Sequence, residues 1–390
     1  MKKIVISRTA DRKIETFFPW IYENEIRKRP GEVRRGELVE IYSLSNEFLG
    51  TGYFNPQSVI CVRMLSFDRE PVNKDLFRKR ILKAAVFRQK IIKNTNAYRI
   101  IHSEADELPG LIVDYYDGYL ALQINTAGME NWREAIIESL VEVLHPKGIY
   151  EKSDERSRML EGIETSEKVI HGTLPEKILI TENGVRFSVR LKDSQKTGFY
   201  LDQRKNRAAV SRYVEKGFSV LDVFSNTGGF GIYAAIRGAD RVRLVDISQS
   251  ALEQARENAA LNGLEKIETI RADAFDFLTE LPGSADRFDM IVLDPPSFTK
   301  TKQGKIGALK GFRHLVLNSL RILKPGGYLA VFSCSHHVSM EDLKNALLEV
   351  SGQSRVRLDI QEHLFQDLDH PVILNVPQSL YLKGLLLKAC

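Results

Sequence analysis

The second half of the chain alternates short apolar runs with longer amphipathic stretches. Apolar runs rich in branched residues predict strands near 219–224, 241–246, 266–270, 288–293 and 327–332. Between and after them, apolar residues recur at helical spacing, which predicts helices near 228–237, 248–262, 307–323 and 340–350. Strands that alternate with helices at this spacing are typical of a parallel, doubly wound α/β sheet. We therefore expect one such domain over residues 178–390.

The first half of the chain has a different pattern. Strand-like runs around turn residues, such as Glu47–Phe54 and Val59–Leu65, predict a small β-rich domain over residues 1–70. A basic amphipathic helix is expected at 74–93, with apolar positions that include Leu82 and Val86. It opens a small α/β domain over residues 71–177, with further strands near 111–114, 119–124 and 148–150 and a helix at 132–144.

Composition places the chain among ordinary globular proteins. Its 390 residues are 43% hydrophobic and 27% charged, and no run of 18 apolar residues indicates a membrane span. The start lacks the apolar stretch of a signal peptide, so we expect a cytoplasmic protein. The three cysteines, Cys61, Cys334 and Cys390, suggest neither a disulfide framework nor a metal site.

Charge is unevenly distributed along the sequence. Residues 51–100 hold 11 Lys and Arg against 3 Asp and Glu, whereas residues 101–150 hold 2 against 9. Such blocks are typical of a protein with one positive face, for which a polyanion is the natural partner. The other interpretation of each block is a solvated helix surface.

Three acidic residues lie at the ends of three successive predicted strands. Asp222 precedes a glycine-containing turn that opens a helix, Asp246 ends the next strand, and Asp273 follows the third. Strand ends form the ligand-binding edge of such sheets, where Asp246 could accept ribose hydroxyls and Asp273 an adenine amino group. Each acid alone could be a helix N-cap, but three in succession favour a nucleoside ligand. The missing pyrophosphate fingerprint argues against a nicotinamide dehydrogenase.

Two further strand ends carry reactive groups. Asp294 is followed by two prolines that stiffen the backbone, and Cys334 lies about forty residues further on, after the strand near 327–332. Addition of a thiolate to carbon 6 of a pyrimidine makes carbon 5 nucleophilic, and a carboxylate can bind the amino edge of the ring. Cys334 could instead be a small buried hydrophobic residue. Its position beside the Asp-Pro-Pro strand favours the nucleophile.

The motifs together resemble one family along nearly the whole chain. They are Asn55-Pro56, Leu108-Pro109-Gly110-Leu111, Lys196–Arg204, Asp294-Pro295-Pro296, Ser333-Cys334-Ser335, Asp369–Val372 and Tyr381–Gly384. The chain is similar to PUA-domain-containing methyltransferases that use S-adenosylmethionine to form 5-methylcytosine in large-subunit ribosomal RNA. The resemblance implies a Rossmann-like class I methyltransferase domain, an N-terminal PUA-like β-barrel that binds RNA, and a homodimer.

The resemblance also implies roles for individual residues. Cys334 would be the nucleophile, with Asp294 as its catalytic partner. The implied cofactor contacts are Phe199, Asp222, Phe224, Asn226, Gly228, Asp246, Asp273 and Asp294. Another group of RNA cytosine methyltransferases has a second cysteine where this chain has Ser297, so the base that removes the carbon 5 proton is unassigned.

A basic loop follows the Asp-Pro-Pro motif. Phosphates around an extruded base could be bound there by Lys300, Lys302, Lys305 and Arg313. Two alternatives stay open at this point. A guanine ring-nitrogen or amino methyltransferase would share the Asp-Pro-Pro loop without needing Cys334, and a non-catalytic RNA-binding assembly factor would need no working cofactor pocket.

Overall fold

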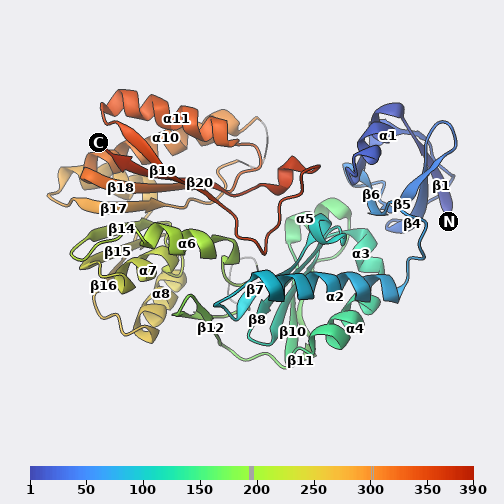
Figure 1. Cartoon of the computed structure of the whole chain (residues 1–390), viewed down its shortest axis with the longest axis horizontal. Coiled ribbons are helices and arrows are strands. Elements are labelled where there is room, and N and C mark those ends of the chain that lie inside the picture. The colour runs from blue at the N-terminus through green and yellow to red at the C-terminus, as the bar shows by residue number, and fades with distance from the viewer. Residues whose placement is uncertain (193–196, 300, 302) are drawn as a thin grey trace. The chain divides into compact units, whose positions relative to one another are not determined.

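The computed structural model describes residues 1–192, 197–299, 301 and 303–390 (Figure 1). The chain divides into two compact units built from interleaved segments. The first contains Met1–Thr181, Val189–Leu201 and Leu368–Pro377. The second contains Glu182–Ser188, Asp202–Asp367 and Gln378–Cys390. The strands β12 (Ile178–Glu182) and β13 (Val185–Val189) lie where the chain passes from one unit to the other.

The first unit begins with a six-stranded sheet in the order β2-β6-β5-β4-β1-β3. Its elements are β1 (Lys2–Ile6), α1 (Arg8–Glu15), β2 (Trp20–Tyr22), β3 (Ile26–Lys28), β4 (Glu37–Tyr42), β5 (Phe48–Phe54) and β6 (Ile60–Ser66). Buried aliphatic residues such as Ile4, Ile41 and Val62 point from these strands into one core. This small β domain lies where the sequence predicted it.

A mixed five-stranded sheet follows, in the order β11-β10-β9-β8-β7. It comprises β7 (Ala97–His102), β8 (Leu111–Tyr116), β9 (Tyr119–Ile124), β10 (Gly148–Lys152) and β11 (Glu167–Gly172), with helices α2 (Lys74–Ile91), α3 (Ala127–Asn131), α4 (Arg133–Leu144) and α5 (Glu155–Glu161). The predicted apolar stripe of α2 is buried at Leu76, Phe77, Ile81 and Ala85 but not at Leu82 and Val86. Leu82 and Val86 are exposed, whereas Arg80 and Arg88 are buried in ion pairs.

The two charge blocks of the sequence meet within this unit. Cations of residues 51–100 form ion pairs with acids of residues 101–150: Arg63 with Glu104, Lys74 with Glu138 and Glu142, Arg80 and Lys83 with Glu107, Arg88 with Asp106, and Arg99 with Asp114. Much of the charge of the basic block is therefore balanced by the acids of the next block, in pairs that are buried, as Arg88–Asp106, or exposed, as Lys83–Glu107.

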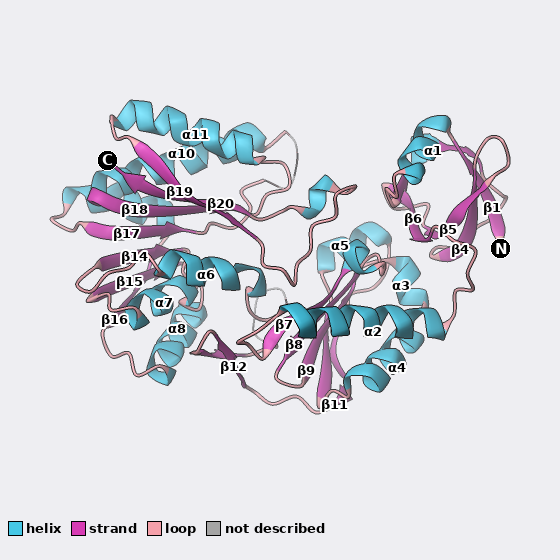
Figure 2. Ribbon diagram, in the orientation of Figure 1, coloured by secondary structure: helices cyan, strands magenta, loops and turns pink. Residues whose placement is uncertain are grey.

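The second unit is a doubly wound α/β domain. Its seven-stranded sheet has the order β16-β15-β14-β17-β18-β20-β19, and helices cover both faces (Figure 2). The strands are β14 (Ser219–Val223), β15 (Arg241–Asp246), β16 (Ile267–Arg271), β17 (Phe288–Leu293), β18 (Leu323–Ser333), β19 (Leu358–Phe365) and β20 (Lys383–Ala389). The helices are α6 (Arg204–Ser211), α7 (Gly229–Ile236), α8 (Gln249–Leu261), α9 (Ala274–Glu280), α10 (Lys305–Ile322) and α11 (Met340–Ser354).

Side chains of each strand alternate between two cores. Leu221 and Leu293 pack with α9, α10 and α11 on one face, whereas Val220 and Val292 pack with α6, α7 and α8 on the other. The parallel strands β14 to β18 occur where the apolar runs predicted them, and the α/β fold class is confirmed. The sequence analysis did not predict α6, α9 or the antiparallel strands β19 and β20.

Within the part of the chain that the structure describes, no helix has the length and hydropathy needed to cross a membrane.

Candidate active site

The carboxyl edge of the seven-stranded sheet carries five of the predicted site residues in one row. Following the order of the strands, the row runs Asp273 after β16, Asp246 at the end of β15, Asp222 near the end of β14, Asp294 after β17 and Cys334 after β18. Neighbouring strands in a sheet lie about 4.8 Å apart, so consecutive members of this row are close in space. The edge thus brings acids and a thiol together along one side of the domain.

The loop between β14 and α7 has an unusual backbone. Phe224 and Asn226 adopt positive φ angles of 62° and 47°, and Gly228 follows with 83°. Such angles are strained for residues with a side chain and cluster at ligand-binding sites. The amide of Asn226 donates to Oδ2 of Asp246, 2.9 Å away. The loop is therefore bent against the neighbouring strand end, with backbone available for close approach to a ligand.

Asp222 is the most buried acid of the row, at 1% exposure. Its Oδ2 accepts a hydrogen bond from the amide of Gly231 at 2.9 Å, in the first turn of α7. Burial is the main reason that the pKa of Asp222 is raised to about 8; the hydrogen bond from Gly231 opposes this shift, and the neighbouring carboxylates of Asp294 and Asp246 add to it. Such a carboxyl group gains most from a ligand that brings a positive charge.

Asp246 and Asp273 differ in how their carboxylate oxygens are hydrogen-bonded. Asp246 accepts the amides of Asn226 and Ser248, one on each oxygen, both at 2.9 Å. Asp273 is the N-cap of α9, and its Oδ1 accepts the amides of Phe275 and Asp276. The N-cap interpretation is therefore correct for Asp273, and its contact with adenine stays a prediction.

Sequence reasoning missed Ile247, which directly follows Asp246. Its side chain is 65% exposed at the edge that carries the acids. An exposed apolar side chain there is suited to pack against the flat face of a purine. In the sequence, the signal for Ile247 was an aliphatic residue immediately after Asp246, the acid that ends β15.

Asp294 is oriented by a chain of buried amides that sequence reasoning also missed. Nε2 of Gln203 donates to Oδ2 of Asp294 at 2.9 Å, and Nδ2 of Asn206 donates to Oε1 of Gln203 at 2.6 Å. Both amide residues are almost fully buried. The Asn206 bond fixes which end of the Gln203 amide faces the carboxylate. In the sequence, the signal for this contact was the motif Lys196–Arg204, which contains Gln203 and precedes β14.

Replacing Gln203 with methionine is expected to lower the turnover number about 10- to 100-fold, because a hydrogen bond to a charged group contributes about 1.5–3 kcal/mol. Cofactor affinity should change much less, because Asp222 and Asp246 are held by their own hydrogen bonds to backbone amides. Initial rates and calorimetric cofactor titrations would measure both quantities. Gln249→Met, an exposed position on α8, is the control. An unchanged turnover number would show that Asp294 does not depend on this contact.

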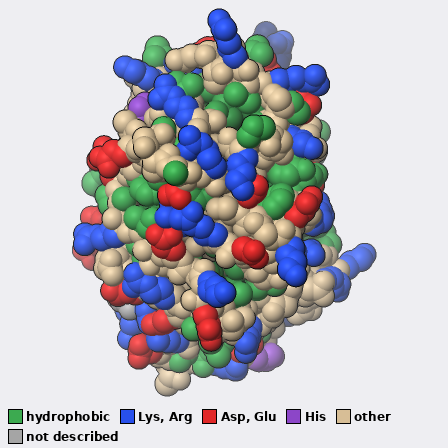
Figure 3. Space-filling view, turned by 90° about the vertical axis from the view of Figure 1, so that its left-hand side faces the viewer, with side chains coloured by type: hydrophobic (Ala, Val, Ile, Leu, Met, Phe, Trp, Pro, Cys, Tyr) green, Lys and Arg blue, Asp and Glu red, His purple; other side chains and the backbone are tan. Residues whose placement is uncertain are grey.

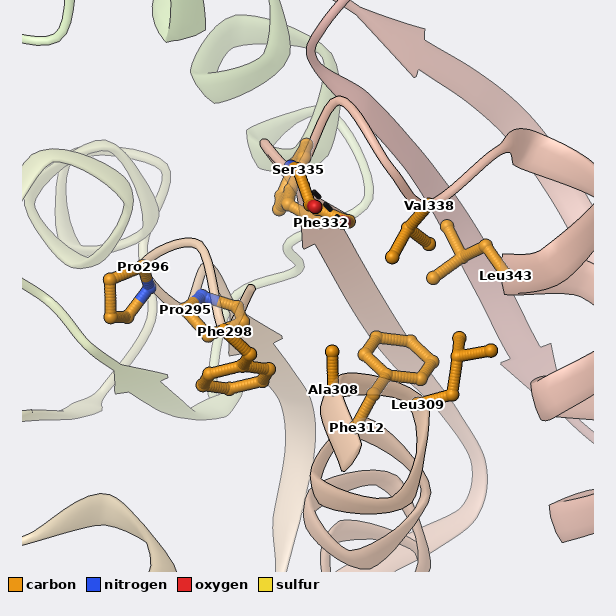
Figure 4. Close-up of a pocket in the computed structure, with 11 residues that line it drawn as sticks. Pro295, Pro296, Phe298, Ala308, Leu309, Phe312, Phe332, Ser335, Val338 and Leu343 are labelled. Carbon is orange, nitrogen blue, oxygen red and sulfur yellow. Dashed lines mark hydrogen bonds between the residues drawn. The ribbon is translucent and has the colours of Figure 1, made fainter. Parts of the chain in front are cut away.

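Cys334 is half-buried directly beyond β18, and its loop is joined to the loop after β17. Oγ of Ser335 donates to the carbonyl of Thr299, 3.4 Å away. Beneath these loops is an apolar cavity of about 20 Å³ (Figure 4). It is lined mainly by side chains from the Asp-Pro-Pro loop and α10, including Phe298, Ala308 and Phe312. A cavity of this size has room for about one water molecule, which is too little for a nucleobase.

The remaining residues that were predicted to contact cofactor or RNA do not belong to the row of strand ends. Phe199 belongs to the first unit, where its amide donates to the hydroxyl of Tyr116 at 3.0 Å. Lys300 and Lys302 lie outside the described residues, as does Lys196 of the segment that contains Phe199. Lys305 forms an ion pair with Asp342, and Arg313 pairs with Glu349. On the face drawn in Figure 3, cationic and anionic side chains are interspersed.

A doubly wound sheet with acids at successive strand ends is typical of α/β proteins that bind a nucleoside at that edge. The buried Asp222 carboxyl group, the bent loop and Asp246 fit a nucleoside with a cationic tail, as in S-adenosylmethionine. Residues 134–387 match the family described as S-adenosylmethionine-dependent methyltransferase, and residues 4–67 match the PUA-like domain. The chain belongs to this methyltransferase family, and S-adenosylmethionine is its cofactor.

Relatives match the chain from end to end. Proteins named ribosomal RNA large subunit methyltransferase I are 37% identical over 388 residues in Vibrio cholerae (strain O395) and over 387 residues in Aliivibrio fischeri (strain ES114), each match covering 98% of both chains. The crystal structure of SMU.776 complexed with SAH superposes with a TM-score of 0.87 and 24% identity over the full length of both chains. At that identity, the structural match shows a shared fold.

Proposed function

We propose that this protein transfers a methyl group from S-adenosylmethionine to carbon 5 of a cytosine in large-subunit ribosomal RNA, through a covalent adduct of Cys334. The name of the full-length relatives supports ribosomal RNA of the large subunit as the substrate. The PUA-like domain supports an RNA partner. The choice of cytosine carbon 5 depends on the position of Cys334.

The observation that carries this proposal is the register of three strands. Leu293 of β17 lies opposite Val331 of β18 on one side and opposite Val223 of β14 on the other. Asp294 therefore emerges between the β14–α7 loop, which we call the cofactor loop, and the loop that carries Cys334. A base whose amino edge is bound by Asp294 would have the methyl donor on one side and the thiol on the other.

The residues of the site have distinct tasks in this reaction. Sγ of Cys334 forms a bond to carbon 6 of the ring, and the displaced electron pair makes carbon 5 nucleophilic. Asp294 accepts a hydrogen bond from the amino group of the cytosine and holds the ring in the attacking geometry. S-adenosylmethionine, when bound, supplies an electrophilic methyl group. Loss of the carbon 5 proton to a base then expels the Cys334 thiolate and restores the aromatic ring.

The product identifies the reaction. Ribosomal RNA that lacks its methyl groups would be incubated with the enzyme and isotope-labelled S-adenosylmethionine, digested, and analysed by nucleoside mass spectrometry. Labelled 5-methylcytosine is expected, and RNA that has first reacted to completion with unlabelled cofactor should take up no label. Labelled methylguanosine would contradict the proposal in favour of the guanine methyltransferase alternative. Cofactor binding without any transfer would favour the assembly factor.

A further inference from the structure

Lys383 extends the row of site residues by one strand. It is the first residue of β20, which pairs with β18 in antiparallel orientation, so that Lys383 lies opposite Ser333. Because β20 runs in reverse, its beginning lies at the same edge as the ends of the parallel strands. The side chain of Lys383 is nevertheless almost fully buried, at 4% exposure. A buried lysine is costly and is rarely retained without a partner.

The contacts of Lys383 direct its ammonium group to the Cys334 loop. Nζ donates to the carbonyl of Ser335, the residue after Cys334, at 2.7 Å. Burial lowers the pKa of Lys383, and the nearby Cys334 and Asp342 partly oppose this effect. Asp342 already accepts Lys305 and the N-cap residue of α11. On β19, the residue opposite Lys383 is Phe365, which carries no charge.

We propose that Lys383 activates Cys334 by stabilising its thiolate with a buried ammonium group held at the Ser335 carbonyl. This inference deepens the proposed function and rests on it for the use of the thiolate. A cation close to a thiol favours the ionised form. In this proposal the thiol proton leaves to solvent and Lys383 carries the positive charge. Lys383 is thus a positioning and activating residue that acts through Cys334.

The experiment compares the ionisation of Cys334 in ligand-free protein variants. Alkylation of Cys334 by iodoacetamide would be followed by peptide mass spectrometry across a pH series, since only the thiolate reacts. Lys383→Gln can still donate to the Ser335 carbonyl but removes the charge, and Lys383→Arg retains the charge. Lys388→Met, further along β20, is the control. The pH midpoint of alkylation should rise by about one unit or more in Lys383→Gln and stay near wild type in the other two.

A Lys383→Gln profile that coincides with wild type would overturn the role of Lys383. If Lys383→Gln does not fold, Lys383→Met takes its place in the same assay. Its melting temperature is recorded first, to show that this variant is folded. Alkylation needs neither RNA nor cofactor, so this outcome is independent of the methylated product. Methylguanosine as product would instead refute the cytosine proposal, whatever the thiol profile shows.

Discussion

Replacing Cys334 with alanine is expected to reduce methyl transfer by at least about 1,000-fold, the largest effect predicted for this chain. Without the adduct at carbon 6, carbon 5 of cytosine is too weak a nucleophile to attack a methyl sulfonium. Cofactor affinity should stay within about twofold of wild type, because Cys334 follows β18 while the cofactor loop follows β14, with β17 between them. Single-turnover rates and cofactor titrations would separate the two effects.

Covalent trapping tests the same residue by a second route. RNA that contains 5-fluorocytidine at the target should accumulate as a protein adduct with the wild-type enzyme, because fluorine cannot leave as the carbon 5 proton does. Cys334→Ala should form no adduct. Cys390→Ala is the matched control, since Cys390 is exposed at the last residue and should behave as wild type. An adduct or appreciable turnover with Cys334→Ala would exclude the thiolate mechanism.

Replacing Asp222 with asparagine is expected to weaken cofactor binding about 10- to 100-fold. Asparagine can still accept the Gly231 amide, so the local fold is preserved, but it cannot acquire the negative charge that the carboxyl group takes on when a cationic ligand binds. A hydrogen bond to a charged group contributes about 1.5–3 kcal/mol, which corresponds to this change in the dissociation constant. Calorimetric titration with S-adenosylmethionine would measure it. Asp240→Asn, at an exposed position before β15, is the control.

The raised pKa of Asp222 also gives cofactor binding a defined pH dependence. Its pKa of about 8 leaves the carboxyl group largely protonated at neutral pH in the free protein. A cationic ligand lowers that pKa, so binding should release a proton and strengthen as the pH rises towards 8. Titrations near pH 7 in buffers of different ionisation enthalpy would count the proton. Equal proton release by Asp222→Asn would contradict the assignment.

The raised pKa of Asp222 also predicts how the stability of the free protein depends on pH. The folded-state pKa lies above the ordinary value of 3.8, so the neutral carboxyl group stabilises the fold at low pH. This contribution is lost as the pH rises from about 4 through about 8. Above pH 8, Asp222→Asn should therefore melt at a higher temperature than wild type in the absence of cofactor. A lower melting temperature there would show that the buried charge is compensated in the fold.

The sequence by itself determined the α/β fold and much of the candidate site. Branched apolar runs are long enough to identify buried parallel strands, and Asp222, Asp246, Asp273, Asp294 and Cys334 lie at or just after the ends of those runs. In a parallel sheet every such strand end lies at one edge, so local pattern alone predicts which residues meet. The antiparallel strand β20 breaks this rule, which is why Lys383 was not predicted at the same edge.

Only the tertiary structure decided which polar groups are paired. Charge counts along the chain cannot show that the basic residues of 51–100 meet the acidic residues of 101–150, because ion pairs depend on distances across elements. Nor can they show that Gln203 orients Asp294 or that Lys383 reaches the Cys334 loop. Hydrophobic periodicity is a property of neighbouring residues, whereas burial of a charge beside its partner is a property of the folded chain.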